Sequence, residues 1–269
     1  MPGFPHHRWP GDQAYRYLED IGPTGLAWEW LRRDPAYRRL EPAPHRMGRT
    51  GVILIEHAAH PVVTRWGCLN VENSTLPAPD GAILWSSALD PSILRCLAVP
   101  AAIGQAGAFN LELCGEKAVV VKGGAGAEHI LIGARPGGLR IDLLEGTLLQ
   151  GPVMLRYDFS AADDIEPSLT TLRAFHHLCR MGKLSHRAIK KRQRDRRVVD
   201  ALRTHDALQA GASIRDVGIL LFGAGRVAEE WGAPGEALKS QCRRMIALAR
   251  RMAGGGYRCL LQSKTSRHT

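Results

Sequence analysis

A row of cationic and polar side chains recurs along residues 235–253 at the spacing of one helical face. Near a base edge, arginine can make two hydrogen bonds to guanine and glutamine can do the same with adenine, whereas lysine mostly holds phosphate. The row therefore has the chemistry of a surface that contacts double-stranded DNA, and Glu236 is the one acid within it. Its members are Lys239, Ser240, Gln241, Arg243, Arg244, Arg250 and Arg251.

An apolar stripe along the same stretch predicts a helix over about 235–253 that buries its other side. The apolar residues recur at intervals of three and four, which is the period of an amphipathic helix. They are Leu238, Cys242, Met245, Ala249 and Met252. An ordinary surface helix with solvated arginines is the alternative, but such a helix usually mixes both signs of charge. The near absence of acids favours contact with DNA.

A helix with clear end signals precedes this row, over residues 213–222. Ser213 has the position of an N-cap residue, Asp216 follows three residues later, and Gly223 ends the apolar pattern. A helix of this form is typical of the first helix of a helix-turn-helix unit. We therefore predict such a unit, in which the helix over 235–253 enters the major groove. The residues expected nearest the bases are Lys239, Gln241, Arg243 and Arg244.

A second basic block, with the sequence KKRQRDRR, occupies residues 190–197. An isolated run of this kind is by default a solvated helix face. Beside a helix-turn-helix unit it becomes a candidate clamp on the DNA backbone, together with Arg226. The candidate phosphate contacts in the block are Lys190, Lys191, Arg192 and Arg194.

The distribution of charge along the chain agrees with this interpretation. The formal net charge of the 269 residues is +10. Residues 1–155 carry 14 basic and 15 acidic side chains, net −1, whereas residues 156–269 carry 22 and 11, net +11. A region this basic is typical of a polyanion binder, because cations placed on phosphates release condensed counterions. A basic surface kept for solubility is the alternative.

Residues 12–40 have the pattern of two short helices with many aromatic side chains. The sequence GPTG at 22–25 separates the two, and Thr24 is a candidate N-cap for a helix over 26–33. We interpret the segment as a small domain that buries its rings on the rest of the protein or on a neighbouring subunit. An aromatic platform for stacking bases is the alternative, which acidic neighbours such as Glu29 disfavour.

The middle of the chain has the pattern of a β module. Residues 41–51 resemble a linker, and residues 52–159 alternate short apolar runs with turn residues. Helices of useful length are missing between these runs, so a doubly wound nucleotide-binding fold is disfavoured and mostly antiparallel pairing is expected. The predicted strands are 82–85, 93–99, 118–122, 129–134, 139–144 and 153–159, with a tight turn at 135–138.

The helical pattern resumes after this module, beginning with a predicted helix over 166–180. The fold class expected from the sequence is therefore α+β. It comprises a short helical N-terminal domain (12–40), a β-rich central module (52–159) and an all-α DNA-binding domain with a helix-turn-helix unit (160–262).

Other groups of chemically capable residues are weaker candidates. The loop KGGAG at 122–126 lacks the ending of a phosphate-binding loop, so a hairpin turn is the better interpretation. His57 and His60, and the group at 176–179, lack further ligands at metal-binding spacing. The six cysteines include no Cys-x-x-Cys pair, which indicates reduced thiols. We expect no catalytic residue, no metal and no cofactor.

The sequence contains no apolar run of membrane-spanning length and no secretory signal at its N-terminus. We therefore expect a cytoplasmic, nucleoid-associated protein with no membrane partner.

The chain resembles the C-terminal DNA-binding domain of the RovC-like family of bacterial regulators in four stretches. These are LRTHDALQAGASIRDVGILLFG (202–223), VAEEW (227–231), LKSQCRRMIALARRM (238–252) and GGYRCLL (255–261). A fifth stretch, AYRYLEDIGPTGLAWEWLRRDPAYRR (14–39), is similar to the short N-terminal domain that often accompanies it.

The resemblance implies a transcriptional activator with a variant helix-turn-helix, similar to those of plasmid partition and replication-initiation proteins. The family includes activators of type VI secretion genes and FseA-like activators of the excision of integrative and conjugative elements. Control of the excision and transfer genes of such an element is the function we expect. The expected partners are promoter DNA, further copies of this chain, RNA polymerase and a small antiactivator protein of the same domain family.

Two alternatives stay open at this point. A plasmid-type replication or partition factor would bind iterated repeats near a replication gene. A small-ligand-binding enzyme with an accessory helical domain would bind a nucleotide or metabolite through residues 52–159, and nothing in the sequence speaks for it.

Overall fold

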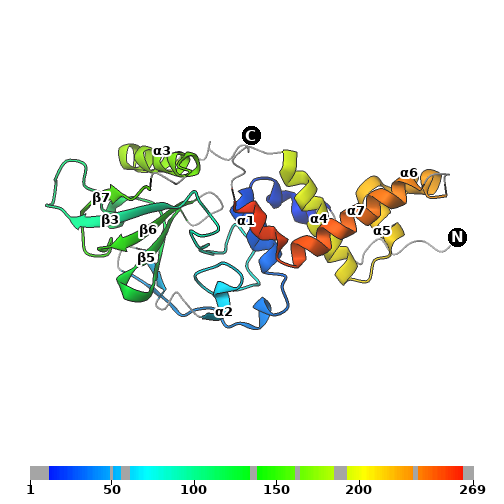
Figure 1. The fold of residues 1–269 in the computed structure, drawn as a ribbon, viewed down its shortest axis with the longest axis horizontal. Coiled ribbons are helices and arrows are strands. Elements are labelled where there is room, and N and C mark those ends of the chain that lie inside the picture. The colour runs from blue at the N-terminus through cyan, green and yellow to red at the C-terminus, as the bar shows by residue number, and fades with distance from the viewer. Residues whose placement is uncertain are drawn as a thin grey trace.

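The computed structural model describes residues 12–48, 51–55, 61–133, 138–160, 164–184, 193–232 and 236–262. A β-sheet covered by one helix lies at one end of the molecule, and helices from both ends of the chain lie at the other (Figure 1). The predicted α+β class, with a β module between helical segments, is confirmed.

The sheet has seven strands in the order β1-β2-β4-β5-β6-β3-β7. Neighbouring strands are antiparallel except for the pairs β2/β4 and β3/β6, so the predicted mostly antiparallel pairing is confirmed. The strands are β1 (His45–Met47), β2 (Ile53–Ile55), β3 (Leu94–Pro100), β4 (Ala118–Lys122), β5 (Glu128–Ile132), β6 (Leu139–Glu145) and β7 (Val153–Tyr157).

Two strand predictions were wrong. Residues 82–85 form no strand, and only Trp85 makes an isolated antiparallel bridge, with Cys68. The side-chain amide of Asn70 bonds the backbone before Trp85: it donates to the Ala82 carbonyl at 3.0 Å and accepts from the Leu84 N–H at 2.9 Å. The expected linker at 41–51 contains β1, which pairs with β2. A strand of three residues is too short to show an alternation of apolar and polar side chains, so the sequence did not reveal β1. Strand β1 forms because β2, its partner, lies beside β4 in the sheet.

The two faces of the sheet are covered differently. One face packs Ile130 and Ile141 against Phe175 and Leu178 of α3, the helix that lies above the sheet in Figure 1. The other face packs a smaller apolar group under residues 69–84. Helix α3 falls within the helical region expected at 160–262, yet the core that it contributes to is that of the sheet.

The helices predicted over 26–33, 166–180, 213–222 and 235–253 are present, with ends that differ by a few residues. The α-helices are α1 (Gly22–Leu31), α2 (Pro61–Thr64), α3 (Glu166–Met181), α4 (Gln193–Gln209), α5 (Ile214–Phe222), α6 (Ala224–Glu230) and α7 (Ala237–Ala253). The 3₁₀ helices are η1 (Asp12–Glu19), η2 (Tyr37–Arg39), η3 (Leu111–Leu113), η4 (Gly124–Gly126) and η6 (Gly256–Leu260).

Helix α1 begins earlier than its sequence suggested. The helix starts at Gly22, and Thr24 lies inside its first turn instead of capping it. Pro23 is compatible with this start, because the first turn of a helix leaves its N–H groups without intrahelical partners and proline has none to satisfy. The prediction that Thr24 is an N-cap was therefore wrong.

The largest core cluster joins the two ends of the chain. Trp28, Trp30 and Leu31 of α1 are almost completely buried. They share one apolar cluster with Leu202 of α4 and Met252 of α7. The aromatic rings of the N-terminal segment are thus used for docking onto the C-terminal helices, which confirms that part of the interpretation.

Candidate nucleic-acid interface

Helix α5 has the ends that its sequence predicted. The Ser213 hydroxyl accepts the Asp216 N–H at 3.2 Å, and the Asp216 carboxylate accepts the Ser213 N–H at 2.8 Å, so a complete capping box starts the helix. Gly223 ends α5 with a φ of 86°, a backbone conformation that favours glycine. The same glycine begins α6, so α5 and α6 are joined by a single residue.

Helices α5, α6 and α7 meet at Gly218. A Cβ atom at Gly218 would lie 2.8 Å from the Trp231 ring, 3.3 Å from Val227 and 3.5 Å from the Cys242 sulfur. The absence of a side chain therefore lets α5 approach α6 and α7 closely. The close contact holds α7 against α5, the arrangement expected for the predicted helix-turn-helix unit.

Helix α7 buries the predicted stripe and exposes the predicted cations. Leu238, Cys242, Ala249 and Met252 are buried, and Met245 packs partly buried beside them. The guanidinium-bearing residues on the opposite side are all exposed, and Lys239 is half-buried. The exposed residues are Arg243, Arg244, Arg250 and Arg251.

The N-terminal end of this row is partly neutralised by Glu236. Its carboxylate accepts hydrogen bonds from the Lys239 ammonium at 3.1 Å and from the Arg243 guanidinium at 3.3 Å. These two hydrogen bonds hold the pKa of Glu236 below its ordinary value. Glu236 therefore competes with a phosphate for two cations of the row, Lys239 and Arg243.

The C-terminal end of the row is uncompensated. Within the part of the chain that the structure describes, neither Arg250 nor Arg251 has an acidic partner. Arg244 makes only a hydrogen bond to the Ser240 hydroxyl, at 3.3 Å. Exposed guanidinium groups without acidic partners are the groups best suited to bind an anion.

Gln241 lies on a different side of α7 from the arginines. It lies on the same face of the helix as Leu248, two turns later, and Leu248 packs against the core. Gln241 is half-buried as a result. The arginines, and not Gln241, are the residues of this helix most open to a partner.

Helix α6 is electrostatically unlike α7. Arg226 pairs with Glu230 at 2.9 Å and lies over the Phe222 ring, 5.3 Å from its centroid. Glu229 is also exposed on this helix. Because its one cation is matched by two acids, α6 is less suited to approach DNA than α7.

Part of the second basic block lies outside the described residues. These are Lys190, Lys191 and Arg192, and the side chain of Arg194 is likewise not described. Arg196 and Arg197 are exposed at the start of α4.

Two arginines that the sequence did not single out, Arg258 and Arg65, contact each other beyond the end of α7. A Cβ atom at Gly256 would lie 3.3 Å from Cγ of Arg251, and one at Gly255 would lie 3.8 Å from the Arg258 guanidinium. Arg258 in turn donates to the backbone carbonyl of Arg65. Arg65 is exposed and is 193 residues away in the chain, so no local spacing could have revealed it.

The glycine loop that the sequence analysis set aside is a turn in the structure. The loop at 122–126 is a turn between antiparallel β4 and β5, closed by hydrogen bonds between Gly123 and Ala127 and between Ala127 and Gly124, which confirms the hairpin interpretation. His57 and His60 lie outside the described residues. Among the described residues, no three metal-ligating side chains gather, and no helix is long and apolar enough to cross a membrane.

Comparison with known families gives two matches. Residues 159–262 match the RovC DNA-binding domain model, described as "T6SS, Transcription factor, DNA binding domain". Residues 8–68 match a model described as "Proteobacterial transcriptional regulator-like domain". No curated protein matches the chain.

Proposed function

We propose that the chain is a DNA-binding transcriptional regulator of the RovC-like family, and that it is a sequence-specific activator that reads the major groove with α7. Arg243 and Arg244 would contact base edges in this role, with Lys239 and Ser240 beside them and Gln241 at the margin of the contact. The observation that carries the proposal is the two-sided character of α7: one side is buried in the core, and the other presents exposed arginines.

The remaining cations would hold the DNA backbone. Arg250 and Arg251 lie at the uncompensated end of α7, and Arg258 and Arg65, which contact each other beyond the helix, would add further cations. Arg226 would add a phosphate contact if DNA displaced Glu230 from it. The block that includes Lys190, Lys191, Arg192 and Arg194 keeps its proposed place as a clamp. Contacts of this kind set the orientation of the protein on DNA without reading sequence.

We propose further that the target is a promoter of the excision or transfer genes of an integrative and conjugative element. Activation there would need contact with RNA polymerase. A second copy of the chain would allow two half-sites to be bound, and a small antiactivator carrying the same domain could block the activator. These proposals are supported by the sequence resemblance and not by a feature of the fold.

Selection from a random DNA library with the full-length chain tests the proposal. We expect enrichment of one motif, and transcription that rises when this motif is placed upstream of a reporter promoter in the presence of the protein. Recovery of no motif would contradict sequence-specific binding. A motif that occurs as iterated repeats beside a replication gene, with no effect on the reporter, would instead support a replication or partition factor.

A further inference from the structure

The two matched segments, at opposite ends of the chain, form one packed unit. Helix α4 packs against α7 and α5 on one side and against α1 and η1 on the other. The apolar cluster that buries the α1 tryptophans includes Ala201 of α4 and Ala249 of α7. The position of the basic row therefore depends on contacts made by α4, and α4 in turn rests on the N-terminal segment.

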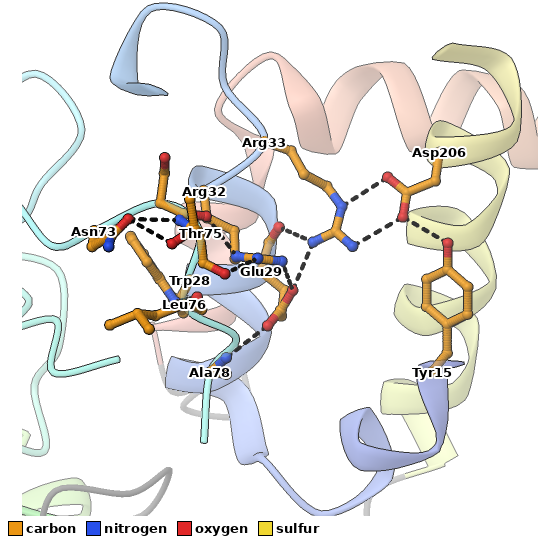
Figure 2. A network of polar contacts seen from close by, with 11 residues as sticks. Tyr15, Trp28, Glu29, Arg32, Arg33, Asn73, Thr75, Leu76, Ala78 and Asp206 are labelled. Atoms are coloured by element: carbon orange, nitrogen blue, oxygen red, sulfur yellow. Dashed lines mark hydrogen bonds and ion pairs between the residues drawn. The ribbon is translucent and has the colours of Figure 1, made fainter. Parts of the chain in front are cut away.

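A chain of charged groups fixes α4 to this segment (Figure 2). Arg33, just past α1, donates to both carboxylate oxygens of Asp206 on α4, from Nε at 2.7 Å and from Nη2 at 2.9 Å. The Tyr15 hydroxyl donates to the same carboxylate at 2.7 Å. The third guanidinium nitrogen of Arg33 donates to the Glu29 carboxylate at 2.6 Å, and Glu29 is completely buried.

The ion pair between Arg33 and Asp206 fixes the relative orientation of two segments, which apolar packing alone does not do. A planar guanidinium that makes two parallel bonds to a carboxylate fixes both distance and rotation between the elements that carry them. Burial alone would lower the pKa of Arg33, but the hydrogen bond and the charge of Asp206 raise it above its ordinary value. Burial and the charge of Asp206 also raise the pKa of Tyr15. Arg33 therefore keeps its positive charge and Tyr15 keeps its proton near neutral pH.

We propose that Arg33 and Asp206 are positioning residues for DNA binding. Their ion pair holds α4 in the orientation that presents the basic row of α7, so the N-terminal segment belongs to the DNA-binding unit without itself having to touch DNA. The inference rests on the proposed function, because its readout is the affinity for DNA. Without the ion pair, the binding-competent arrangement is a smaller fraction of the population, and the apparent affinity falls by that fraction.

The test compares Arg33→Gln, Asp206→Asn and the double variant of the full-length chain on the selected DNA motif. Each single change is expected to weaken binding by about 10-fold, and the double variant by no more than either single, because both remove the same ion pair. Single effects that multiply in the double variant, or that are absent, would overturn the inference. Asp158→Asn is the matched control, since it breaks an exposed ion pair with Arg95 on the sheet and should leave affinity unchanged.

The salt dependence separates positioning from direct contact. The slope of affinity against salt concentration should stay at its wild-type value in Arg33→Gln, because no phosphate contact is lost. If the slope of log affinity against log salt concentration became smaller by about 1, Arg33 would be a phosphate contact and not a positioning residue. Active fractions are measured by titration with excess DNA, so that misfolded protein does not count as weakened binding.

A milder variant guards against loss of folding. Tyr15→Phe removes one hydrogen bond to Asp206 and no charge, and it should weaken binding by about two- to threefold. Unchanged affinity in all these variants, with the wild type binding its motif, would overturn this inference alone. Failure of the wild type to bind any DNA would overturn the proposed function.

Discussion

Arg33 and Asp206 are 173 residues apart in the sequence and make a two-pronged ion pair with distances of 2.7 and 2.9 Å. The pair joins the segment that follows α1 to the last turn of α4 (Figure 2). Because the β module lies between these segments in the sequence, this helical core is assembled from segments on both sides of the module.

Gly218→Ala should destabilise the protein by about 1–3 kcal/mol, because the new methyl group overlaps the Trp231 ring at the junction of α5, α6 and α7. Urea unfolding measures the free energy. Gly225→Ala is the control: it lies in α6 with no atom within 4 Å of the added Cβ, and it should stabilise by about 0.5 kcal/mol. A Gly218→Ala protein as stable as wild type would show that the three helices are not closely packed.

Glu236→Gln should tighten DNA binding by about two- to fivefold, because it releases Lys239 and Arg243 and removes an acid from the contact surface. Fluorescence anisotropy at fixed salt measures the affinity. Glu145→Gln makes the same chemical change at the exposed end of β6 and should have a smaller effect. Weaker binding by Glu236→Gln would place α7 away from the DNA.

Glu29→Gln should cost about 3–5 kcal/mol of folding free energy, because it leaves Arg32 and Arg33 facing a neutral amide in a buried site. The loss of the charge also weakens the hydrogen bond that the Ala78 N–H donates to the Glu29 carboxylate, which is 2.7 Å long in the wild type. The measurement is the free energy of unfolding in guanidinium chloride. A cost below about 1 kcal/mol would mean that the carboxylate is as well solvated as a surface ion pair.

Acid should weaken the fold through His205. Burial lowers the pKa of His205 below its ordinary value of 6.5, with the charge of Asp206 opposing and that of Arg33 adding to the shift. Between the folded and unfolded pKa values the unfolded chain binds more protons, so stability is lost as the pH falls below about 6.5.

Urea unfolding at a series of pH values checks this dependence, with His205→Gln as the comparison. The variant should lose less stability than wild type as the pH falls from about 7.5 to about 5.5. Equal losses in the two proteins would assign the pH dependence to other groups.

The parts of the interface that depend on local spacing could be predicted from the sequence. The capping box of Ser213 and Asp216, the stop at Gly223 and the two sides of α7 each involve residues within a few turns of one another. Helical periodicity and capping act over that range, so the sequence pattern was sufficient.

The parts that depend on distant segments could not be predicted. Arg258 meets the Arg65 carbonyl, and Arg33 meets Asp206, only in the assembled core. Residues 82–85 have the composition of a strand, but the Asn70 side chain bonds Ala82 and Leu84, and only an isolated bridge of Trp85 with Cys68 forms. In each case a contact between distant segments determines the structure, and the periodicity of apolar residues along the sequence does not reveal such contacts.

The measurement that tests the account most directly is the salt dependence of DNA binding by the wild type and by the Arg243→Ala/Arg244→Ala double variant. We expect wild-type affinity to fall by roughly 10³–10⁵ between about 50 and 200 mM salt if six to ten phosphates are contacted. The double variant should lose specific binding while its thermal unfolding stays nearly unchanged, since both arginines are exposed. Wild-type affinity that ignores salt, or a double variant that binds its motif as tightly as wild type, would contradict the assignment of α7 as the DNA-contacting helix.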